Sequence, residues 1–339
     1  MKKYTPIATG IFLAIAAGGA LSQTVIVNQM GNGNSALPAV DATVTGSVIL
    51  INQNGDFNSS VPQQVNNTSN SLISHTQVGD SNSAVSLQDD ASGSFAFITQ
   101  TSDSNDATTN QWSANGSSAA ISQSGWGGQM AWINQQTVNS NFATVNQTKN
   151  SNTATVWQFN GTGNVTTVNQ EGHFIGNNEM QTTQGSGHFN TIDATQVGNA
   201  QTGFVSQIGG SGNYSFSYQF GKYNELNVAQ SGDGNDSHVE QYWESNLAVH
   251  FQSGDDNYAF TEQLTQNNIA QTVQTGDMNV SSISQFGGNM NQYYITQTGD
   301  SNEFIATQNG NSNFISVVQN GGLVMGINQI GDGNSFIFP

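Results

Sequence analysis

The stretch that decides the fold is residues 224–241, NELNVAQSGDGNDSHVEQ. Asn224 is followed six residues later by Gln230, and Asn235 is followed six residues later by Gln241. A Gly-Asp-Gly turn signal separates the two pairs. A catalytic motif would occur once, whereas a spacing that recurs along the chain indicates a repeated structural unit.

This spacing recurs along nearly the whole chain. An amide or hydroxyl residue stands six positions before a glutamine from Ser47 and Gln53 to Asn313 and Gln319. From Gln219 to Gln285 the glutamines follow one another every 11 residues. We predict that these side chains form ladders from repeat to repeat and that the ladders serve self-assembly. The predicted ladder residues are Asn82, Gln88, Asn105, Gln111, Asn141, Gln147, Asn152, Gln158, Asn224, Gln230, Asn235, Gln241, Asn257, Gln263, Asn279, Gln285, Asn302, Gln308, Asn313 and Gln319.

Each unit reads as a half-buried strand. Residues at even offsets share one face of a strand. That face carries the amide, then a small residue, then a β-branched residue, then the glutamine, as in Asn141, Ala143, Val145 and Gln147. The opposite face varies freely, which is typical of a strand with one face in a core.

Turn residues fill the gaps between the units. Many gaps follow the pattern Gln-x-Gly-x-x-Asn, and the predicted turn glycines are Gly79, Gly232, Gly254, Gly276, Gly299 and Gly310. Two strands and two turns give a closed rung of about 22 residues, and rungs would stack at about 4.8 Å. We therefore predict an all-β fold, a repeat β-solenoid with two strands per rung and cross-β stacking, in which like amides satisfy one another.

The two ends of the chain differ from the repeats. Residues 1–22 begin with two lysines and an apolar run too short to span a bilayer comfortably, and they predict a signal peptide. Residues 23–70 are an irregular segment with the first degenerate repeats, and residues 71–339 are the solenoid repeats. Pro38 and Pro62 mark this segment as irregular, because proline cannot donate to a central ladder. The segment is either a cap or secretion segment or a decayed first rung.

Composition excludes several classes of function. Outside the predicted signal the chain has two lysines and no arginine against 22 acidic residues, a net charge of −20, so nucleic acid is not an expected partner. There is no cysteine, and a disulfide cannot stabilise the exported chain. We expect no enzyme activity, no cofactor and no membrane insertion after cleavage of the signal. The five histidines show no metal-ligand spacing. Stacked turn aspartates could bind calcium, but the chain lacks the GGxGxDxUx repeat of calcium-binding β-rolls, and the aspartates are therefore interpreted as turn-forming and solubilising residues.

The repeats resemble the curlin repeat of bacterial curli fibre subunits. The residues that carry the resemblance are Gln77-x-Gly79-x-x-Asn82-x-Ala84-x3-Gln88 and Asn279-x5-Gln285-x-Gly287, and the match covers roughly residues 23–334. The resemblance implies an extracellular functional amyloid, export through an outer-membrane pore, a nucleator subunit as a partner and a role in biofilm matrix. This chain has more repeats than familiar curlins, and residues 23–40 resemble their glycine-rich export segment only loosely.

The sequence therefore predicts a secreted structural subunit that forms extracellular, curli-like amyloid fibres on a bacterial surface for adhesion and biofilm matrix. Two alternatives stay open: a minor nucleator of the same fibre, and a monomeric β-solenoid that binds ice or polysaccharide. The final segment could plug the solenoid or offer an adhesive edge, with Phe336 and Phe338 facing inward. Outward aromatics would either make lateral contacts or reflect strand propensity; they are Phe95, Phe97, Trp157, Tyr214, Phe216, Tyr218 and Phe251.

Overall fold

The computed structural model describes residues 23–173 and 177–339. The predicted signal peptide, residues 1–22, lies outside the described residues. The chain divides into two compact units, Met1–Gly163 and Asn164–Pro339, which we call unit 1 and unit 2. Every regular element in the described residues is a strand, so the prediction of an all-β fold is confirmed. No helix in residues 23–173 or 177–339 has the length and apolar character needed to cross a membrane.

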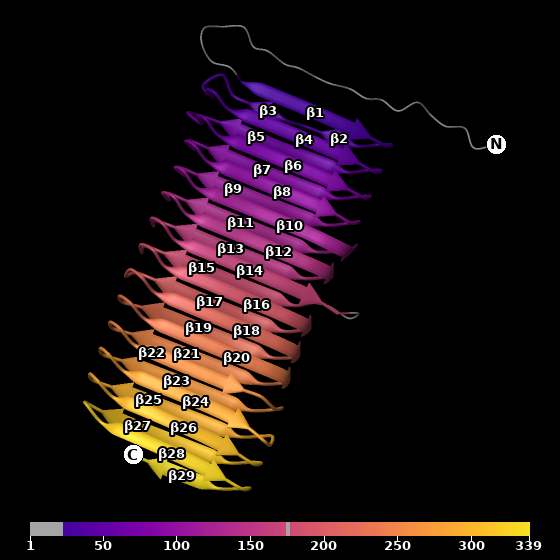
Figure 1. The fold of residues 1–339 in the computed structure, drawn as a ribbon. Coiled ribbons are helices and arrows are strands. Elements are labelled where there is room, and N and C mark those ends of the chain that lie inside the picture. Colours follow the sequence, from indigo (N-terminus) through magenta and orange to yellow (C-terminus); the bar gives the residue numbers. More distant parts are fainter. Residues whose placement is uncertain (1–22, 174–176) are drawn as a thin grey trace, which may run out of the picture. The chain divides into compact units, whose positions relative to one another are not determined.

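Unit 1 contains two parallel sheets, and Figure 1 shows the strands of each sheet side by side. Sheet 1A consists of β1 (Thr24–Met30), β4 (Val48–Asn54), β6 (Leu72–Val78), β8 (Phe95–Thr101), β10 (Ser118–Gly127) and β12 (Phe142–Asn150). Sheet 1B consists of β2 (Ser35–Ala36), β3 (Ala39–Val40), β5 (Ser59–Val65), β7 (Ser83–Asp89), β9 (Asp106–Trp112), β11 (Met130–Gln136) and β13 (Thr153–Phe159).

Unit 2 repeats this arrangement. Sheet 2A consists of β14 (Val165–Gly172), β16 (Thr191–Asn199), β18 (Tyr214–Lys222), β20 (Asp236–Glu244), β22 (Tyr258–Gln263), β24 (Val280–Phe286), β26 (Glu303–Asn309) and β28 (Val324–Ile330). Sheet 2B consists of β15 (Glu179–Gly185), β17 (Thr202–Ile208), β19 (Glu225–Ser231), β21 (Leu247–Ser253), β23 (Ile269–Thr275), β25 (Gln292–Thr298), β27 (Phe314–Asn320) and β29 (Ser335–Phe338).

The chain of each unit coils as a β-solenoid. From β4 onward within each unit, successive strands alternate between the two sheets, and each strand pairs in parallel with the strand two places along the chain. At the start of unit 1, β1 pairs with β4, and β2 and β3 both pair with β5. Equivalent residues meet in register, so that Gln219 pairs with Gln241 and Gln241 pairs with Gln263. This register keeps the buried face of each strand above the buried face of the next, because a slip of one residue would turn the apolar set outward.

The core of each unit is thin and made of small and β-branched side chains. In unit 1 a row of alanines in register includes Ala84, Ala107, Ala131 and Ala154, and all four are fully buried. Alternation along the strands confirms the predicted faces, since β7 has the even-numbered residues buried and the odd-numbered residues partly exposed. Larger side chains enter the core near the end of unit 2, where Tyr293 and Phe304 are fully buried.

Proline at position 62 occupies an interior strand. Pro62 lies within β5, which pairs with β7 on one side and with β2 and β3 on the other. Proline is disfavoured in a central ladder. Pro62 has no N–H to donate, and the segment beside it is divided into the two short strands β2 and β3, although the backbone N of Leu37 between them still donates to the Ser60 carbonyl at 2.9 Å.

Candidate functional site: amide ladders and open strand edges

Glutamine side chains form hydrogen-bonded ladders inside both units. The Nε2 of each glutamine donates to the Oε1 of the equivalent glutamine in the next strand of its sheet, at 2.7–3.1 Å. In unit 1 the ladders run through Gln29, Gln53, Gln77, Gln100, Gln123 and Gln147, and through Gln64, Gln88, Gln111, Gln135 and Gln158. In unit 2 they run through Gln170, Gln196, Gln219, Gln241, Gln263, Gln285, Gln308 and Gln329, and through Gln184, Gln207, Gln230, Gln252, Gln274, Gln297 and Gln319.

The same glutamines join the two sheets of a unit. Gln241, in sheet 2A, also donates to the backbone carbonyl of Glu225 in sheet 2B at 2.9 Å. Gln230 does the reverse, donating to the carbonyl of Tyr214 at 2.9 Å and to that of Asn235 at 3.0 Å. Both glutamines therefore satisfy a strand or turn carbonyl as well as their ladder partners, which offsets the cost of burying their polar groups.

Asparagine side chains form a second set of ladders where the strands begin. Asn257 donates from its backbone N at 3.1 Å and from its Nδ2 at 3.0 Å to the Oδ1 of Asn235. Its Nδ2 also donates to the carbonyl of Gly276 in the next turn at 2.8 Å. In the first repeats of sheet 1A serine takes this place, and the Ser71 Oγ accepts from the backbone N of Ser94. Every predicted ladder residue is buried; the set is Asn82, Gln88, Asn105, Gln111, Asn141, Gln147, Asn152, Gln158, Asn224, Gln230, Asn235, Gln241, Asn257, Gln263, Asn279, Gln285, Asn302, Gln308, Asn313 and Gln319.

The predicted turn glycines all have positive φ; they are Gly79, Gly232, Gly254, Gly276, Gly299 and Gly310. Gly254 shows why a side chain does not fit. Its φ is +109°, and an added Cβ would lie 2.3 Å from the carbonyl oxygen of Gly276 in the next turn. Turns stacked this closely leave no room for a Cβ, and L-residues rarely adopt the conformation.

The aspartate after the turn glycine links neighbouring turns. The Oδ1 of Asp255 accepts from the backbone N of Asp233 at 2.8 Å, and the Oδ1 of Asp277 accepts from the backbone N of Asp255 at 2.8 Å. Sequence reasoning missed this bond and assigned the aspartates only to turn formation and solubility. The recurrence of Gly-Asp at one place in the repeat was the signal that could have found it. Among the described residues, no group of three or more histidine, aspartate or glutamate side chains is arranged to hold a metal ion.

Two histidines are part of the core. His250 is fully buried, with its ring nitrogens 2.8 Å from the Ser237 Oγ and 2.8 Å from the Thr261 Oγ1. His75 bridges the Ser60 Oγ at 2.8 Å and the Ser86 Oγ at 2.7 Å in the same manner. Burial lowers the pKa of both histidines to about 3, so both are neutral at physiological pH.

Aromatic side chains lie on the outer faces of the sheets. Across sheet 2A, the ring of His238 stacks between Phe216, at a centroid distance of 4.5 Å, and Phe260, at 5.2 Å. In sheet 1A, Phe95 and Phe97 are stacked at 6.1 Å. The predicted outward aromatics are all at least partly exposed; they are Phe95, Phe97, Trp157, Tyr214, Phe216, Tyr218 and Phe251.

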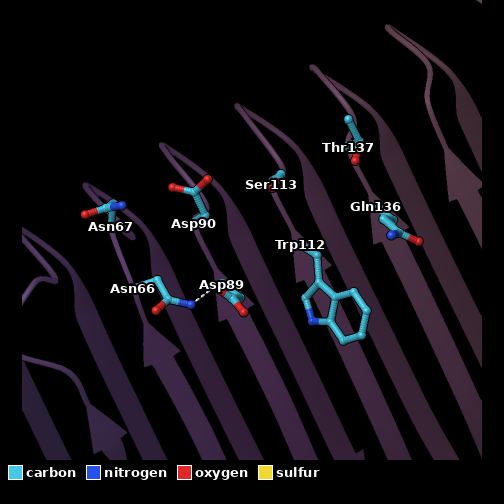
Figure 2. Close-up of a pocket in the computed structure, with 8 residues that line it drawn as sticks. All are labelled: Asn66, Asn67, Asp89, Asp90, Trp112, Ser113, Gln136 and Thr137. Carbon is cyan, nitrogen blue, oxygen red and sulfur yellow. Dashed lines mark hydrogen bonds between the residues drawn. The ribbon is translucent and has the colours of Figure 1, made fainter.

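A polar hollow of about 480 Å³ lies at the ends of the strands of sheet 1B. It is lined by Asn66, Asn67, Asp89, Asp90, Trp112, Ser113, Gln136 and Thr137 (Figure 2). The exposed ring of Trp112 projects from the end of β9, flanked in register by Asp89 on β7 and Gln136 on β11. Asn66 donates a hydrogen bond to Asp89 across the hollow.

Five strands leave an edge without a partner within the described residues. Strand β1 pairs only with β4, β2 and β3 pair only with β5, β28 pairs only with β26 and β29 pairs only with β27. The core beside these edges is incompletely covered: Met325, Ile327, Phe336 and Phe338 are partly buried in unit 2, and so are Ala36 and Val40 in unit 1. The inward direction predicted for Phe336 and Phe338 is thus confirmed. Unpaired edges with apolar flanks favour pairing with another chain.

No known family model matches the chain, and no curated protein matches it at a significant level. The fold and the ladders define the chain as a parallel β-solenoid.

Proposed function

We propose that this chain is a secreted structural subunit that self-assembles into extracellular, curli-like amyloid fibres for adhesion and biofilm matrix. In this proposal each rung consists of two strands and two turns in about 22 residues, and the rungs stack at the cross-β spacing of about 4.8 Å within and between subunits. The resemblance of the repeats to curlins supports an export pore and a nucleator as further partners.

The observation that carries the proposal is the combination of ladders and open edges. Like residues already stack upon like residues inside the chain, and the ladder glutamines lie in hydrogen-bonding register. The strands β1 and β28 each present a free backbone edge at which the same stacking can continue. A second copy needs no new kind of contact, because it adds one more strand to each sheet.

The test uses the chain from Gln23 onward, purified in denaturant and diluted into buffer. We expect unbranched filaments by electron microscopy and fibre diffraction spacings of about 4.8 and 10 Å. A chain that remains monomeric in sedimentation at high concentration for days would refute the proposal. Immunogold labelling of intact cells tests the extracellular location, which requires label outside the envelope.

A second candidate function is binding of polysaccharide, and the hollow around Trp112 favours it. An exposed indole gives a sugar ring an apolar face on which to lie, and the amides, hydroxyls and carboxylates around it supply donors and acceptors for sugar hydroxyls. Its test is co-sedimentation with an insoluble β-glucan such as cellulose. The Trp112→Ala variant should lose binding, whereas Trp243→Ala, which removes an exposed tryptophan outside the hollow, should retain it. Equal binding by both variants, or none by the parent chain, would exclude the hollow as a sugar site.

A further inference from the structure

The segments at the two open edges are nearly the same sequence. Residues 28–35 read NQMGNGNS and residues 328–335 read NQIGDGNS, so that six of eight positions are identical at an offset of 300 residues. Each segment includes the end of an edge strand, a turn and the start of the next edge strand: β1 and β2 in unit 1, β28 and β29 in unit 2. The two free edges therefore present matching residues at matching places.

The hydrogen bonds at these edges have a direction. Gln308 donates to the Oε1 of Gln329 at 2.9 Å, and Gln29 donates to the Oε1 of Gln53 at 2.7 Å. To continue the ladder beyond β28, the Nε2 of Gln329 must donate to an acceptor on the incoming strand. Gln29 is the first glutamine of its ladder, so its Oε1 receives no bond from a preceding glutamine. The edge of β28 offers the amide donor and the edge of β1 offers the acceptor.

The hydrogen bonds of the asparagine ladder and of the turns are also complementary at the two edges. Asn334 donates to the Oδ1 of Asn313 at 2.9 and 3.0 Å, while the Oδ1 of Asn34 accepts from the backbone N of Asn58 at 2.9 Å. The Oδ1 of Asn334 is then the acceptor for the backbone N of an incoming Asn34. In the turns the backbone N of Asn32 donates to an Oδ1 of Asp56 at 2.7 Å, so by the same pattern the backbone N of Asp332 donates to an incoming Asn32.

Charge and shape also match at this junction. Neither β1, TVIVNQM, nor β28, VMGINQI, contains an ionisable residue, although the chain carries a formal charge of −18. In the turn, Asp332 would meet Asn32, so no two carboxylates would face each other at the junction, whereas Asp255 lies next to Asp277 in an interior turn. In the core, Met325 would cover Val25 and Ile327 would cover Val27. These contacts would bury the apolar side chains at the end of the unit 2 core and at the start of the unit 1 core.

We propose, on the basis of the proposed function, that copies of this chain join with one polarity and one register. Strand β1 of one copy adds in parallel to β28 of another, with Gln29 beside Gln329 and Met30 beside Ile330, and β2 adds to β29 with Ser35 beside Ser335. Pairing of two β1 edges or two β28 edges is disfavoured, because it opposes acceptor to acceptor or donor to donor along the glutamine ladder. The fibre is therefore polar, and its two ends expose different edges.

Disulfide trapping tests this register, because the chain contains no cysteine of its own. One preparation carries Met30→Cys and another carries Ile330→Cys; both side chains point outward, with exposures of 51% and 72%. Residues side by side on neighbouring strands lie about 4.8 Å apart, within reach of a disulfide. We expect fibres grown from the mixture and then oxidised to yield disulfide-linked dimers on a non-reducing gel, whereas either preparation alone stays monomeric when dissolved.

The matched control replaces Met30→Cys by Ile26→Cys, an outward residue on the same strand that is four positions away, about 13 Å at 3.3 Å per residue. Mixed with Ile330→Cys, it should give no dimer. Fibres that form normally but crosslink equally with either partner, or that crosslink Ile330→Cys to itself, would overturn the register while leaving the proposed function intact. Absence of fibres in the parent chain would overturn both.

A charge variant provides an independent measurement. Asn32→Asp places a second carboxylate opposite Asp332 at the junction. It also removes the hydrogen bond from the Asn32 Nδ2 to the Asp56 Oδ1 within the chain, so recovery by a change at Asp332 is the measurement that reports on the junction. We expect slower fibre elongation at low ionic strength, recovery of the parent rate in high salt, and recovery at low salt when Asp332→Asn is added. Elongation that is unchanged by Asn32→Asp at low salt would contradict the proposed position of Asn32 at the junction.

Discussion

Replacing Gln241 with leucine tests whether the buried amide ladder stabilises the solenoid. Gln241 takes part in three hydrogen bonds: it donates to the Glu225 carbonyl at 2.9 Å and to the Gln263 Oε1 at 3.0 Å, and it accepts from Gln219 at 2.9 Å. Leucine has a similar volume, so little cavity forms. The substitution leaves the Glu225 carbonyl and the Gln263 Oε1 without these donors, and it leaves one N–H of the Gln219 Nε2 without its acceptor. An unsatisfied buried polar group costs about 1–3 kcal/mol, and the three together cost about 3–9 kcal/mol.

The assay is urea unfolding followed by circular dichroism at low protein concentration, before fibres form. The matched control is Asn227→Ser, because Asn227 is exposed on the outer face of β19, and it should change the free energy of unfolding by less than about 0.5 kcal/mol. The double variant Gln241→Leu, Gln263→Leu should cost less than the sum of the two single variants, because the bond between the two side chains is lost only once. A Gln241→Leu chain that unfolds like the Asn227→Ser chain would refute the reasoning.

Three further predictions follow from the core, the turns and the charge. Because burial holds the pKa of His75 and His250 at about 3, below the unfolded value of about 6.5, stability should be complete above pH 6.5 and fall by about 1.4 kcal/mol per histidine per pH unit between pH 6.5 and 3. His250→Val should remove its share of that slope in a pH series of urea titrations, and an unchanged slope would contradict the assignment. Gly254→Ala should destabilise the chain by more than about 1 kcal/mol, because the position has a positive φ and the new Cβ meets the Gly276 carbonyl oxygen at 2.3 Å; a thermal melt equal to that of the parent would disprove this. Stacked turn aspartates repel one another, so assembly followed by dye binding should accelerate with salt, and NaCl should act as well as CaCl2 at equal ionic strength; a large excess effect of calcium would indicate a carboxylate site.

Much of the fold followed from spacing alone. An amide and a glutamine six residues apart lie on one face of a strand, and the small or β-branched residues between them must then face the core with them. The turn pattern also predicted the positions of the glycines. At Gly254, for example, a positive φ and a closely stacked neighbouring turn leave no room for a side chain. These are short-range constraints, and a single strand with its turn already contains them.

The sequence by itself determined the class of fold, the buried face and the ladder residues, because each repeat obeys the same local geometry. The hydrogen-bond directions and the side-chain clusters depended instead on which residues of neighbouring repeats meet. Only the tertiary structure decided the direction of the amide ladders, the Asp255 carboxylate as acceptor for the neighbouring turn, and the position of His250 between Ser237 and Thr261. It also decided that Asp89, Trp112 and Gln136 share one hollow. The physical reason is that hydrogen-bond direction and side-chain clustering depend on contacts 11 to 24 residues apart, which a periodic pattern permits in more than one arrangement.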